Sequence, residues 1–351
     1  MLAAWTLFFL IPAAAGQGCQ QWQTDWAAFK SAYLEPDGRV IANDKLQSHS
    51  EGQAYSLFFA LVANDPVRFE TILNWTNSHL AHGKLSHRLP AWLWGKREDG
   101  SWGVLDDNSA SDADILLAYT LGEASRLWSR PDYRVLANAV AQHILRDETT
   151  SLPGLGLLVL PGKVGFSGPP WKLNPSYYPT IVLRRMATLH TPEWKKIVQT
   201  AYRLLAQAAP NGVEPDWLYY DKRGVYGRTK GSYDAIRTYL WAGMDKSIEG
   251  DELVVQLAPF LRIASTLGHV PESVDPLSLH AEGKGSSGFD ASITTIQKRQ
   301  GHDVVHPVSG NTGYYTQSLS LFGTGYMIAF DMGPTGELIP FWVTKPSCAR
   351  G

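Results

Sequence analysis

Apolar residues recur every three or four positions over most of this chain, which is the spacing of one face of an α-helix. Trp22, Trp26, Phe29 and Tyr33 are the first set with this spacing. The pattern predicts eleven helices, over residues 22–33, 51–63, 66–81, 111–128, 131–147, 177–190, 193–209, 232–244, 252–267, 287–299 and 312–330. Strand-like sequence is limited to short pieces at 157–166 and 217–226, so an alternating α/β architecture fits poorly. The chain is therefore predicted to be mostly helical.

No linker rich in proline, serine or glycine divides the chain, and no short repeat stands out, so we expect one domain. Helices packed as sequential antiparallel pairs form either an open solenoid or a closed double ring. The closed ring is favoured, because a solenoid normally leaves a repeat signature in the sequence. In such a ring every second helix lies inside and all inner helices begin at the same rim. Residues in their first turns therefore converge.

Three carboxylates open alternate helices of this predicted ring. Glu51 begins the second helix, Asp112 the fourth and Asp234 the eighth, and Tyr177 begins the sixth. Each acid also has a purely structural interpretation, since Ser48 and Glu51 fit a capping box and acids in a first helical turn complement the helix dipole. A tyrosine or tryptophan lies near each acid in the sequence. This combination favours a shared site over three separate caps.

Two carboxylates across a groove lined by aromatic rings are what the hydrolysis of a glycosidic bond requires. One carboxyl gives its proton to the leaving oxygen, and the other is ionised and activates water or attacks carbon. A helix start stabilises an ionised carboxylate, which opposes the role of the acid. The acid therefore needs a second carboxylate nearby, or burial against an aromatic residue such as Tyr55, to raise its pKa.

Charge and composition narrow the class of partner. Lys and Arg number 31 and Asp and Glu 33, so no strongly basic surface indicates a nucleic acid or an anionic membrane. Hydrophobic residues make up 44% of the chain and charged residues 18%, which indicates a compact globular protein. Several tryptophans lie in polar stretches with Gly or Pro, where they are placed to contact a ligand: Trp92, Trp94, Trp102, Trp171 and Trp217.

The N-terminus resembles a secretory signal. Residues 3–12 form an apolar run that ends on small residues at 13–16, but no Lys or Arg precedes the run, and the alternative is a buried N-terminal helix. Cleavage after Ala15 would leave residues 16–351, and no other stretch is apolar over the length that spans a membrane. We therefore expect a soluble protein that is periplasmic or secreted.

The two cysteines, Cys19 and Cys348, lie almost at opposite ends of the chain. An oxidising compartment would let them form a disulfide if the chain ends meet, and the alternative is two separate thiols. The sequence has no helical zinc-binding spacing of histidines and no Cys-x-x-Cys pair. We therefore expect neither a metal site nor a cofactor.

The fourth predicted helix begins at Ala110-Ser111-Asp112-Ala113-Asp114, followed by Ala118, Ala124 and Trp128. This pattern is similar to the signature of the family 8 glycoside hydrolases, once called cellulase family D. Leu117 and Thr120 depart from its usual residues, and neither departure removes a polar catalytic group. The resemblance implies an all-α fold, an (α/α)6 barrel with short β pieces in its loops, as one catalytic domain over residues 16–351. A twelfth helix is missing from our prediction, and we expect it between residues 268 and 311.

The same resemblance implies roles for the acids and their neighbours. Glu51 is expected as general acid and Asp234 as general base, with Asp112 gripping the distorted sugar beside the scissile bond. Members of the family invert the anomeric configuration, so the carboxyl groups of Glu51 and Asp234 should lie about 6.5–9.5 Å apart with a water between them. The implied neighbours are Tyr233 and Arg237 around the base, Trp92 or Trp94 and Trp171 as stacking platforms, and Tyr177, Tyr314 and Tyr315 as further subsite residues.

Segments at 89–96, 153–156, 160–166 and 215–217 resemble the branch of the family found with bacterial cellulose synthases in the periplasm. This implies an endo-β-1,4-glucanase that acts as a monomer, trims nascent cellulose and has the cellulose synthase export machinery as a partner. The alternatives are a hydrolase of another β-1,4 polymer, chitosan or xylan, and a non-catalytic glucan-binding export subunit. A helical scaffold whose caps imitate a site would hold Glu51 more than about 12 Å from both Asp112 and Asp234.

Overall fold

The computed structural model describes residues 14–300, 313–345 and 348. This part of the chain contains eleven helices of nine or more residues, which confirms the mostly helical class. They are α1 (Ala14–Tyr33), α2 (Ser50–Val62), α3 (Pro66–Trp75), α4 (Ser111–Trp128), α5 (Pro131–Asp147), α6 (Thr180–Leu189), α7 (Glu193–Ala208), α8 (Ile236–Met244), α9 (Ile248–Leu267), α10 (Ser287–Arg299) and α11 (Tyr314–Gly325). Shorter helical pieces are η1 (Thr76–Leu80), η2 (Pro175–Tyr177) and α12 (Phe341–Thr344).

Some predicted boundaries were wrong. The helix predicted from residue 232 begins only at Ile236, because residues 232–235 form a turn. The helix predicted from 177 is split into η2 and α6, and the one predicted to reach 330 ends at Gly325. Its predicted first residue, 312, lies outside the described residues. The first helix begins at Ala14, well before the predicted residue 22.

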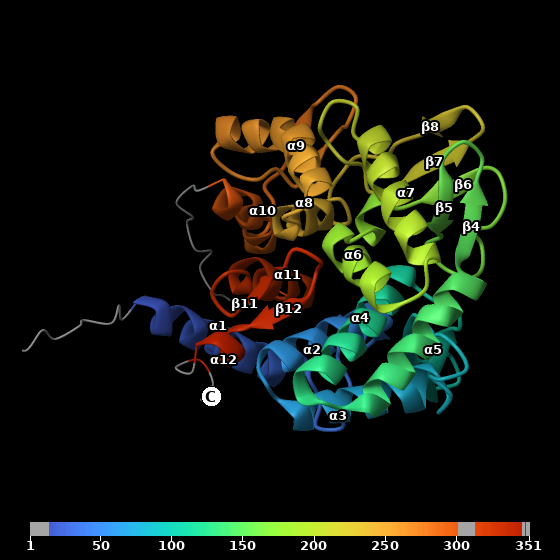
Figure 1. Cartoon of the computed structure of the whole chain (residues 1–351), viewed down its shortest axis with the longest axis vertical. Helices are drawn as coiled ribbons and strands as arrows, with labels where there is room; N and C mark the ends of the chain where they lie inside the picture. Colours follow the sequence, from blue (N-terminus) through green and yellow to red (C-terminus); the bar gives the residue numbers. More distant parts are fainter. Residues whose placement is uncertain (1–13, 301–312, 346–347, 349–351) are drawn as a thin grey trace, which may run out of the picture.

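Six helices contact one another in succession: α2, α4, α6, α8, α10 and α11. The ring of Phe322 on α11 packs against Phe59 and Tyr55 of α2, so this succession returns to its beginning. The helices α3, α5, α7 and α9 each pack against the inner helix that precedes them, and α1 packs against α11. The colours in Figure 1 accordingly pass around the molecule from blue through green and yellow to red.

Burial separates the inner from the outer helices. Every residue of α8 is buried, and in α2 only Glu51 is not. Helix α7, on the outside, buries one face and exposes charged residues on the other, which is the pattern of a helix at a protein surface. The inner helices α8, α10 and α11 approach closely, because a Cβ atom at Gly243 would overlap Thr295 and one at Gly323 would overlap Ala291.

The expected in-out alternation holds from α1 to α10 and then breaks, since α10 and α11 are both inner helices. The twelfth helix was predicted between residues 268 and 311. Residues 268–286 contain two short strands and no helix, so for this part the prediction is wrong, and residues 301–312 lie outside the described residues. The additional short helix α12 instead follows α11.

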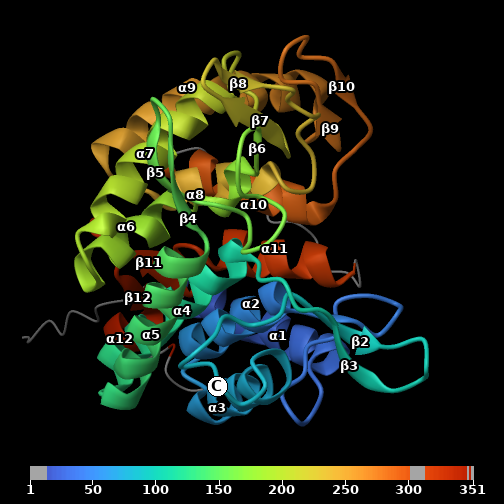
Figure 2. The same cartoon turned by 90° about the vertical axis from the view of Figure 1, so that its right-hand side faces the viewer.

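The strands are short and antiparallel, and form small sheets in the connections between helices. They are β1 (Ser48–His49), β2 (Leu93–Lys96), β3 (Trp102–Asp106), β4 (Thr149–Leu152), β5 (Gly156–Val159), β6 (Trp171–Leu173), β7 (Leu218–Asp221), β8 (Gly224–Tyr226), β9 (Ser273–Val274), β10 (Ala281–Glu282), β11 (Phe330–Met332) and β12 (Leu338–Pro340). All but the last two lie in connections that lead into an inner helix, and the β2–β3 hairpin projects from the molecule in Figure 2. These connections therefore surround the starts of the inner helices.

The two ends of the described chain meet. Cys19 of α1 and Cys348 form a disulfide with a Cα–Cα distance of 5.8 Å, and Phe341 of α12 is buried with them. In the described part of the chain, no helix combines the length and the apolar character that crossing a membrane requires.

Candidate active site

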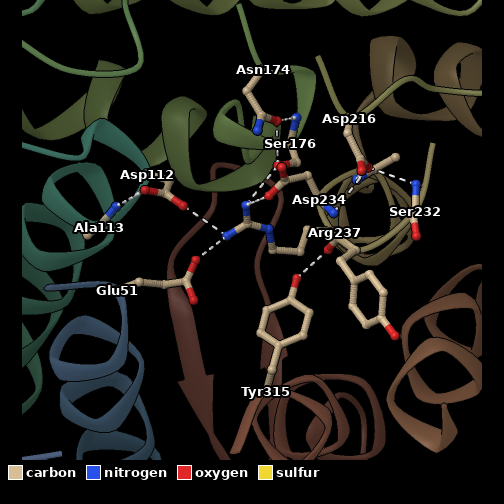
Figure 3. Close-up of polar contacts among 12 residues, drawn as sticks. Glu51, Asp112, Ala113, Asn174, Ser176, Asp216, Ser232, Asp234, Arg237 and Tyr315 are labelled. Carbon is tan, nitrogen blue, oxygen red and sulfur yellow. Dashed lines mark hydrogen bonds and ion pairs between the residues drawn. The ribbon is translucent and has the colours of Figure 1, made fainter. Parts of the chain in front are cut away.

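Three acids that lie far apart in the sequence meet around one arginine (Figure 3). Glu51 and Asp112 are the second residues of α2 and α4, and Asp234 lies in the turn that leads into α8. Arg237, the second residue of α8, donates through Nη1 to Glu51 Oε2 at 2.5 Å and to Asp112 Oδ2 at 2.8 Å. Its Nη2 donates to Asp234 Oδ1 at 2.9 Å. The structure thus brings all three acids to one guanidinium.

Arg237 is itself held in place from two other elements. Its Nη2 donates to Ser176 Oγ of η2 at 3.0 Å, and its Nη1 donates to Tyr55 OH of α2 at 3.1 Å. The ring of Tyr177 lies 5.5 Å from the guanidinium carbon. Only 3% of the arginine side chain is exposed, so the positive charge acts in a site with little water to screen it.

The spacing of the carboxylates follows from these contacts. Glu51 and Asp112 bond to the same nitrogen, at 2.5 and 2.8 Å, which holds their bonded oxygens within about 5 Å of each other. Glu51 and Asp234 bond to different terminal nitrogens, so one guanidinium separates them. The scaffold alternative required Glu51 to lie more than about 12 Å from both other acids, and it is wrong.

The capping interpretation of Glu51 is also wrong. His49 is the N-cap residue of α2, and no side chain caps this helix. Ser48 Oγ instead accepts a hydrogen bond from Arg39, and the Glu51 carboxylate bonds to Arg237. Asp112 combines both roles, because Oδ1 accepts the backbone N–H of the next residue at 2.8 Å while Oδ2 bonds to Arg237.

Burial and charge make the three carboxyls unequal. Burial removes water from around the Glu51 carboxyl and raises its pKa to about 7. The charges of Asp112 and Asp234 add to the rise, and Arg237 opposes it. Burial also raises the pKa of Asp112. Asp234 is the most accessible of the three, with 31% of its side chain exposed against 22% for Glu51 and 10% for Asp112. Glu51 therefore carries a proton in a substantial fraction of molecules at neutral pH.

A second pair of acids lies behind Asp112. Asp114 of α4 and Glu148, directly after α5, are fully buried and close enough for the charge of Glu148 to act on Asp114, and Ser109 Oγ donates to Glu148 Oε1 at 2.5 Å. Burial raises the pKa of both carboxyls. Asp114 belongs to the motif at the start of α4 but had no predicted role. Glu148 was not predicted, since nothing in the local sequence shows that the end of α5 faces the start of α4.

Tyrosines surround the arginine on the side of α11. Tyr315 OH donates to the carbonyl of Tyr233 at 2.5 Å, and 51% of Tyr233 is exposed. Tyr314 is buried below α2, where a Cβ atom at Gly52 would lie 2.7 Å from its hydroxyl. Tyr315 and Tyr233 therefore lie at the site, whereas Tyr314 packs beneath Glu51.

The predicted tryptophans occupy different environments. Trp94 is 8% exposed and packs against the rings of Trp75 and Trp102, at centroid distances of 5.4 and 5.2 Å. Trp92 is half-buried, and its ring lies 5.7 Å from that of His49, two residues before Glu51. Trp171 is 8% exposed and belongs to the main hydrophobic core. Of these three, Trp92 has the most accessible ring next to the acids.

Trp217 was expected to contact a ligand, without a specific role. This half-buried ring lies 6.0 Å from that of Tyr177 and 6.1 Å from that of Phe166, and Lys172 Nζ lies 4.4 Å above it. The sequence signals were its place in a polar stretch next to Pro215 and its position in the segment 215–217.

This arrangement supports proton transfer at a bond to a sugar. Within the described residues, no group of three or more His, Cys, Asp or Glu side chains is placed to hold a metal ion. One carboxyl that keeps a proton near neutral pH, across from a more exposed carboxylate and next to aromatic rings, is the chemistry of the glycoside hydrolases that use two acids.

The comparisons with known proteins place the chain within that class. The model of the glycosyl hydrolases family 8 matches residues 1–328, and the chain belongs to this family. An endoglucanase of Escherichia coli O157:H7 is 40% identical over 350 residues, which cover 95% of each chain, and one of Xanthomonas axonopodis pv. citri is 39% identical over 97% of this chain and 95% of its own. The protein is thus an enzyme, an inverting glycoside hydrolase.

Solved structures of relatives share the fold. An endo-1,4-D-glucanase from Vibrio fischeri ES114 has a TM-score of 0.84 and 38% identity, and the match covers 91% of this chain and 99% of that one. The endo-β-1,4-glucanase CMCax from Acetobacter xylinum has a TM-score of 0.75 and 27% identity, with coverage of 88% and 97%. These proteins are similar to this chain over nearly their whole length.

Proposed function

We propose that this chain is an endo-β-1,4-glucanase in which Glu51 is the general acid and Asp234 the general base. The observation that carries the proposal is the meeting of three carboxylates at Arg237, with the pKa of Glu51 raised to about 7. The relatives reported above are named endoglucanases or endoglucanase-type enzymes, which supports the same substrate class.

The proposed reaction is a single displacement. Glu51 gives its proton to the leaving glycosidic oxygen as the bond to the anomeric carbon breaks, and a water attacks that carbon from the opposite face and passes a proton to Asp234. The exposed fraction of Asp234, 31%, gives it access to that water. Asp112, bonded beside Glu51 to the same nitrogen, is placed to hold the sugar next to the scissile bond. Exchange with solvent then restores both protonation states.

Removing either carboxyl tests the assignment. E51Q and D234N should each lower kcat on carboxymethylcellulose by about 10²–10⁴-fold, since each removes one proton transfer. E193Q is the matched control, because Glu193 stands in the first turn of the outer helix α7 and is exposed. Release of reducing ends is the measurement. Wild-type kcat in E51Q would overturn the role of Glu51.

The stereochemical outcome provides an independent test. Hydrolysis of a β-linked cellooligosaccharide should first release the α-anomer, which proton NMR detects before mutarotation. Release of the β-anomer would mean that the second carboxylate attacks carbon directly.

Assays on several polymers distinguish the remaining substrate alternatives. Carboxymethylcellulose should be cleaved faster than xylan or chitosan under identical conditions, because the relatives are named endoglucanases. A preference for chitosan or xylan would shift the proposal to that polymer. Binding of cellooligosaccharides without release of reducing ends would instead favour a glucan-binding export subunit.

For the architecture, we infer one catalytic domain over residues 16–351 with the six-hairpin (α/α)6 arrangement. The closed succession of six inner helices supports this, as do the five helices that flank them in the described part. A single unfolding transition in calorimetry is the expected result.

For the setting, we propose that residues 1–15 are an export signal and that the mature enzyme is a monomer in the periplasm or outside the cell. There it would trim nascent cellulose beside the synthase export machinery. Residues 1–13 lie outside the described residues, and α1 begins at Ala14. Because cleavage is proposed after Ala15, N-terminal sequencing of the exported protein should give Gly16 as its first residue. Size-exclusion chromatography should show a monomer. Cleavage elsewhere would contradict the assigned boundary.

A further inference from the structure

The turn that carries Asp234 is fastened to a second aspartate. Residues 232–235 precede α8, and their N–H groups therefore have no partner within the helix. Asp216 Oδ1 accepts the N–H groups of Ser232, Asp234 and Ala235 at 2.7, 3.1 and 2.8 Å (Figure 3). One carboxylate oxygen therefore accepts hydrogen bonds from three backbone amides within four residues, and one of them is the amide of Asp234 itself.

Asp216 is held firmly enough to act as an anchor. Its own N–H donates to the carbonyl of Lys230 at 3.1 Å, and next to it Trp217 N–H donates to Thr229 Oγ1 at 2.9 Å. The side chain is half-buried. Burial raises the pKa of Asp216 while the three amides lower it, as expected for a carboxylate that is partly removed from water but well bonded.

Other contacts also hold this turn, and Asp234 itself accepts hydrogen bonds from Arg237, through its carbonyl at 3.1 Å and its carboxylate at 2.9 Å. Ser232 Oγ donates to the carbonyl of Glu272 at 2.6 Å, and Tyr315 OH donates to the carbonyl of Tyr233 at 2.5 Å. Both contacts fix residues before Asp234. The hydrogen bonds that Asp216 accepts are different, because the amides on both sides of the Asp234 Cα atom donate them.

We propose that Asp216 is a positioning residue for the general base: by fixing the backbone of Asp234 it sets the place of the Asp234 carboxylate opposite Glu51 across Arg237. This inference rests on the proposed function. A displacement of the base by about 1 Å can lower the rate up to about a hundredfold. The hydrogen bonds that Asp216 accepts should therefore keep kcat high by holding the Asp234 carboxylate in place.

Two substitutions separate position from charge. D216E keeps the negative charge but moves the accepting oxygen by one methylene, so the three amides lose their fitted partner. D216N keeps an oxygen acceptor at the original place and removes the charge. We expect kcat on cellooligosaccharides to fall about 10–100-fold in D216E, with KM changed less than about threefold, and to stay within about threefold of wild type in D216N.

Asp65 supplies the matched control. Its carboxylate caps α3 by accepting the N–H of Arg68 at 3.0 Å, on an outer helix. D65E and D65N should leave both kinetic constants unchanged. Rates are expressed per folded protein, measured by circular dichroism, so that a loss of folding in D216E is not counted as a loss of kcat.

The possible results are decisive for this inference. Wild-type kcat in D216E would overturn it, as would a D216N variant that loses more kcat than D216E, since the charge and not the position would then matter. D234N distinguishes this failure from failure of the proposed function. If D234N is inactive while D216E is fully active, only the role of Asp216 falls; an active D234N would remove the base assignment itself.

Discussion

At Glu51, opposing effects act on one proton. Burial and the charges of two neighbouring carboxylates favour the neutral acid, whereas Arg237 favours the carboxylate, and the resulting pKa is about 7. The helix start alone would have lowered this pKa. The protonated state that a general acid needs therefore comes from the packing around the helix start.

This pKa predicts a pH dependence of the rate. A general acid must be protonated, so kcat/KM should fall as pH rises through about 7, up to tenfold per pH unit. D112N removes a charge that raises the Glu51 pKa, so its basic limb should move to lower pH in addition to any loss of rate. A pH–rate profile of both proteins checks this. An unmoved limb would show that Asp112 does not act on the proton of Glu51.

The two neighbouring tryptophans should differ when replaced. W92A is expected to raise KM for cellooligosaccharides about two- to tenfold with little change in kcat, because it removes a ring available for stacking. W94A should instead lower the free energy of unfolding by about 3–5 kcal/mol, because Trp94 is buried against Trp75 and Trp102. Kinetics and thermal melts together separate the effect on substrate binding from the effect on stability. A W94A variant with a raised KM and an unchanged Tm would contradict the structural role of Trp94.

Between elements, the start of α4 and the residue that follows α5 meet at a buried pair of acids. Asp114 and Glu148 are both fully buried, and burial raises the pKa of each carboxyl, with the charge of Glu148 adding to the rise for Asp114. Because Asp112 lies two residues from Asp114 in the same helical turn, the pair also supports the position of the site at this helix start.

This pair predicts that stability falls as pH rises. Burial raises the pKa of Glu148 to about 8, so the folded protein binds more protons than the unfolded chain above about pH 4.5. Stability contributed by this group is complete below pH 4.5 and is lost as pH rises to about 8, at up to about 1.4 kcal/mol per pH unit.

Urea unfolding at several pH values measures this slope. E148Q should flatten it, because a neutral amide has no proton to lose and can donate to Asp114. E193Q, on exposed Glu193, should leave the slope as in wild type. An identical slope in E148Q and wild type would show that other groups cause the pH dependence.

For the whole molecule, one covalent bond joins the two ends of the helical succession. Cys19 and Cys348 are 329 positions apart in the sequence. Cys19 lies 14 residues before Tyr33, whose ring contacts that of Tyr314 beneath the site, and this separation is about 21 Å along α1. The disulfide is therefore far from the acids.

Replacing both cysteines should lower stability and not activity. The double variant C19S/C348S is expected to lose about 2–5 kcal/mol of unfolding free energy, since the open chain gains conformational freedom when it unfolds. Its kcat at 25 °C should equal that of wild type. Reductant should lower the Tm of wild type and leave the variant unchanged; equal melting of the two proteins without reductant would contradict the prediction.

The sequence by itself determined where the helices lie and which acids open them, because helix formation and the apolar spacing of three and four are local properties. Glu51, Asp112 and Asp234 could be selected in this way, and the family resemblance could assign their roles. The cysteines marked a possible disulfide, and Cys19 and Cys348 do form one in the structure.

Only the tertiary structure decided which groups meet. The hydrogen bonds of Arg237 to Asp112 and Glu51 span 125 and 186 residues, and nothing local specifies such partners. The same holds for the burial of Trp94 and for the pairing of Asp114 with Glu148. Burial and electrostatic environment depend on atoms from every neighbouring element, so the pKa of Glu51 and the anchor at Asp216 exist only once the inner helices have packed together.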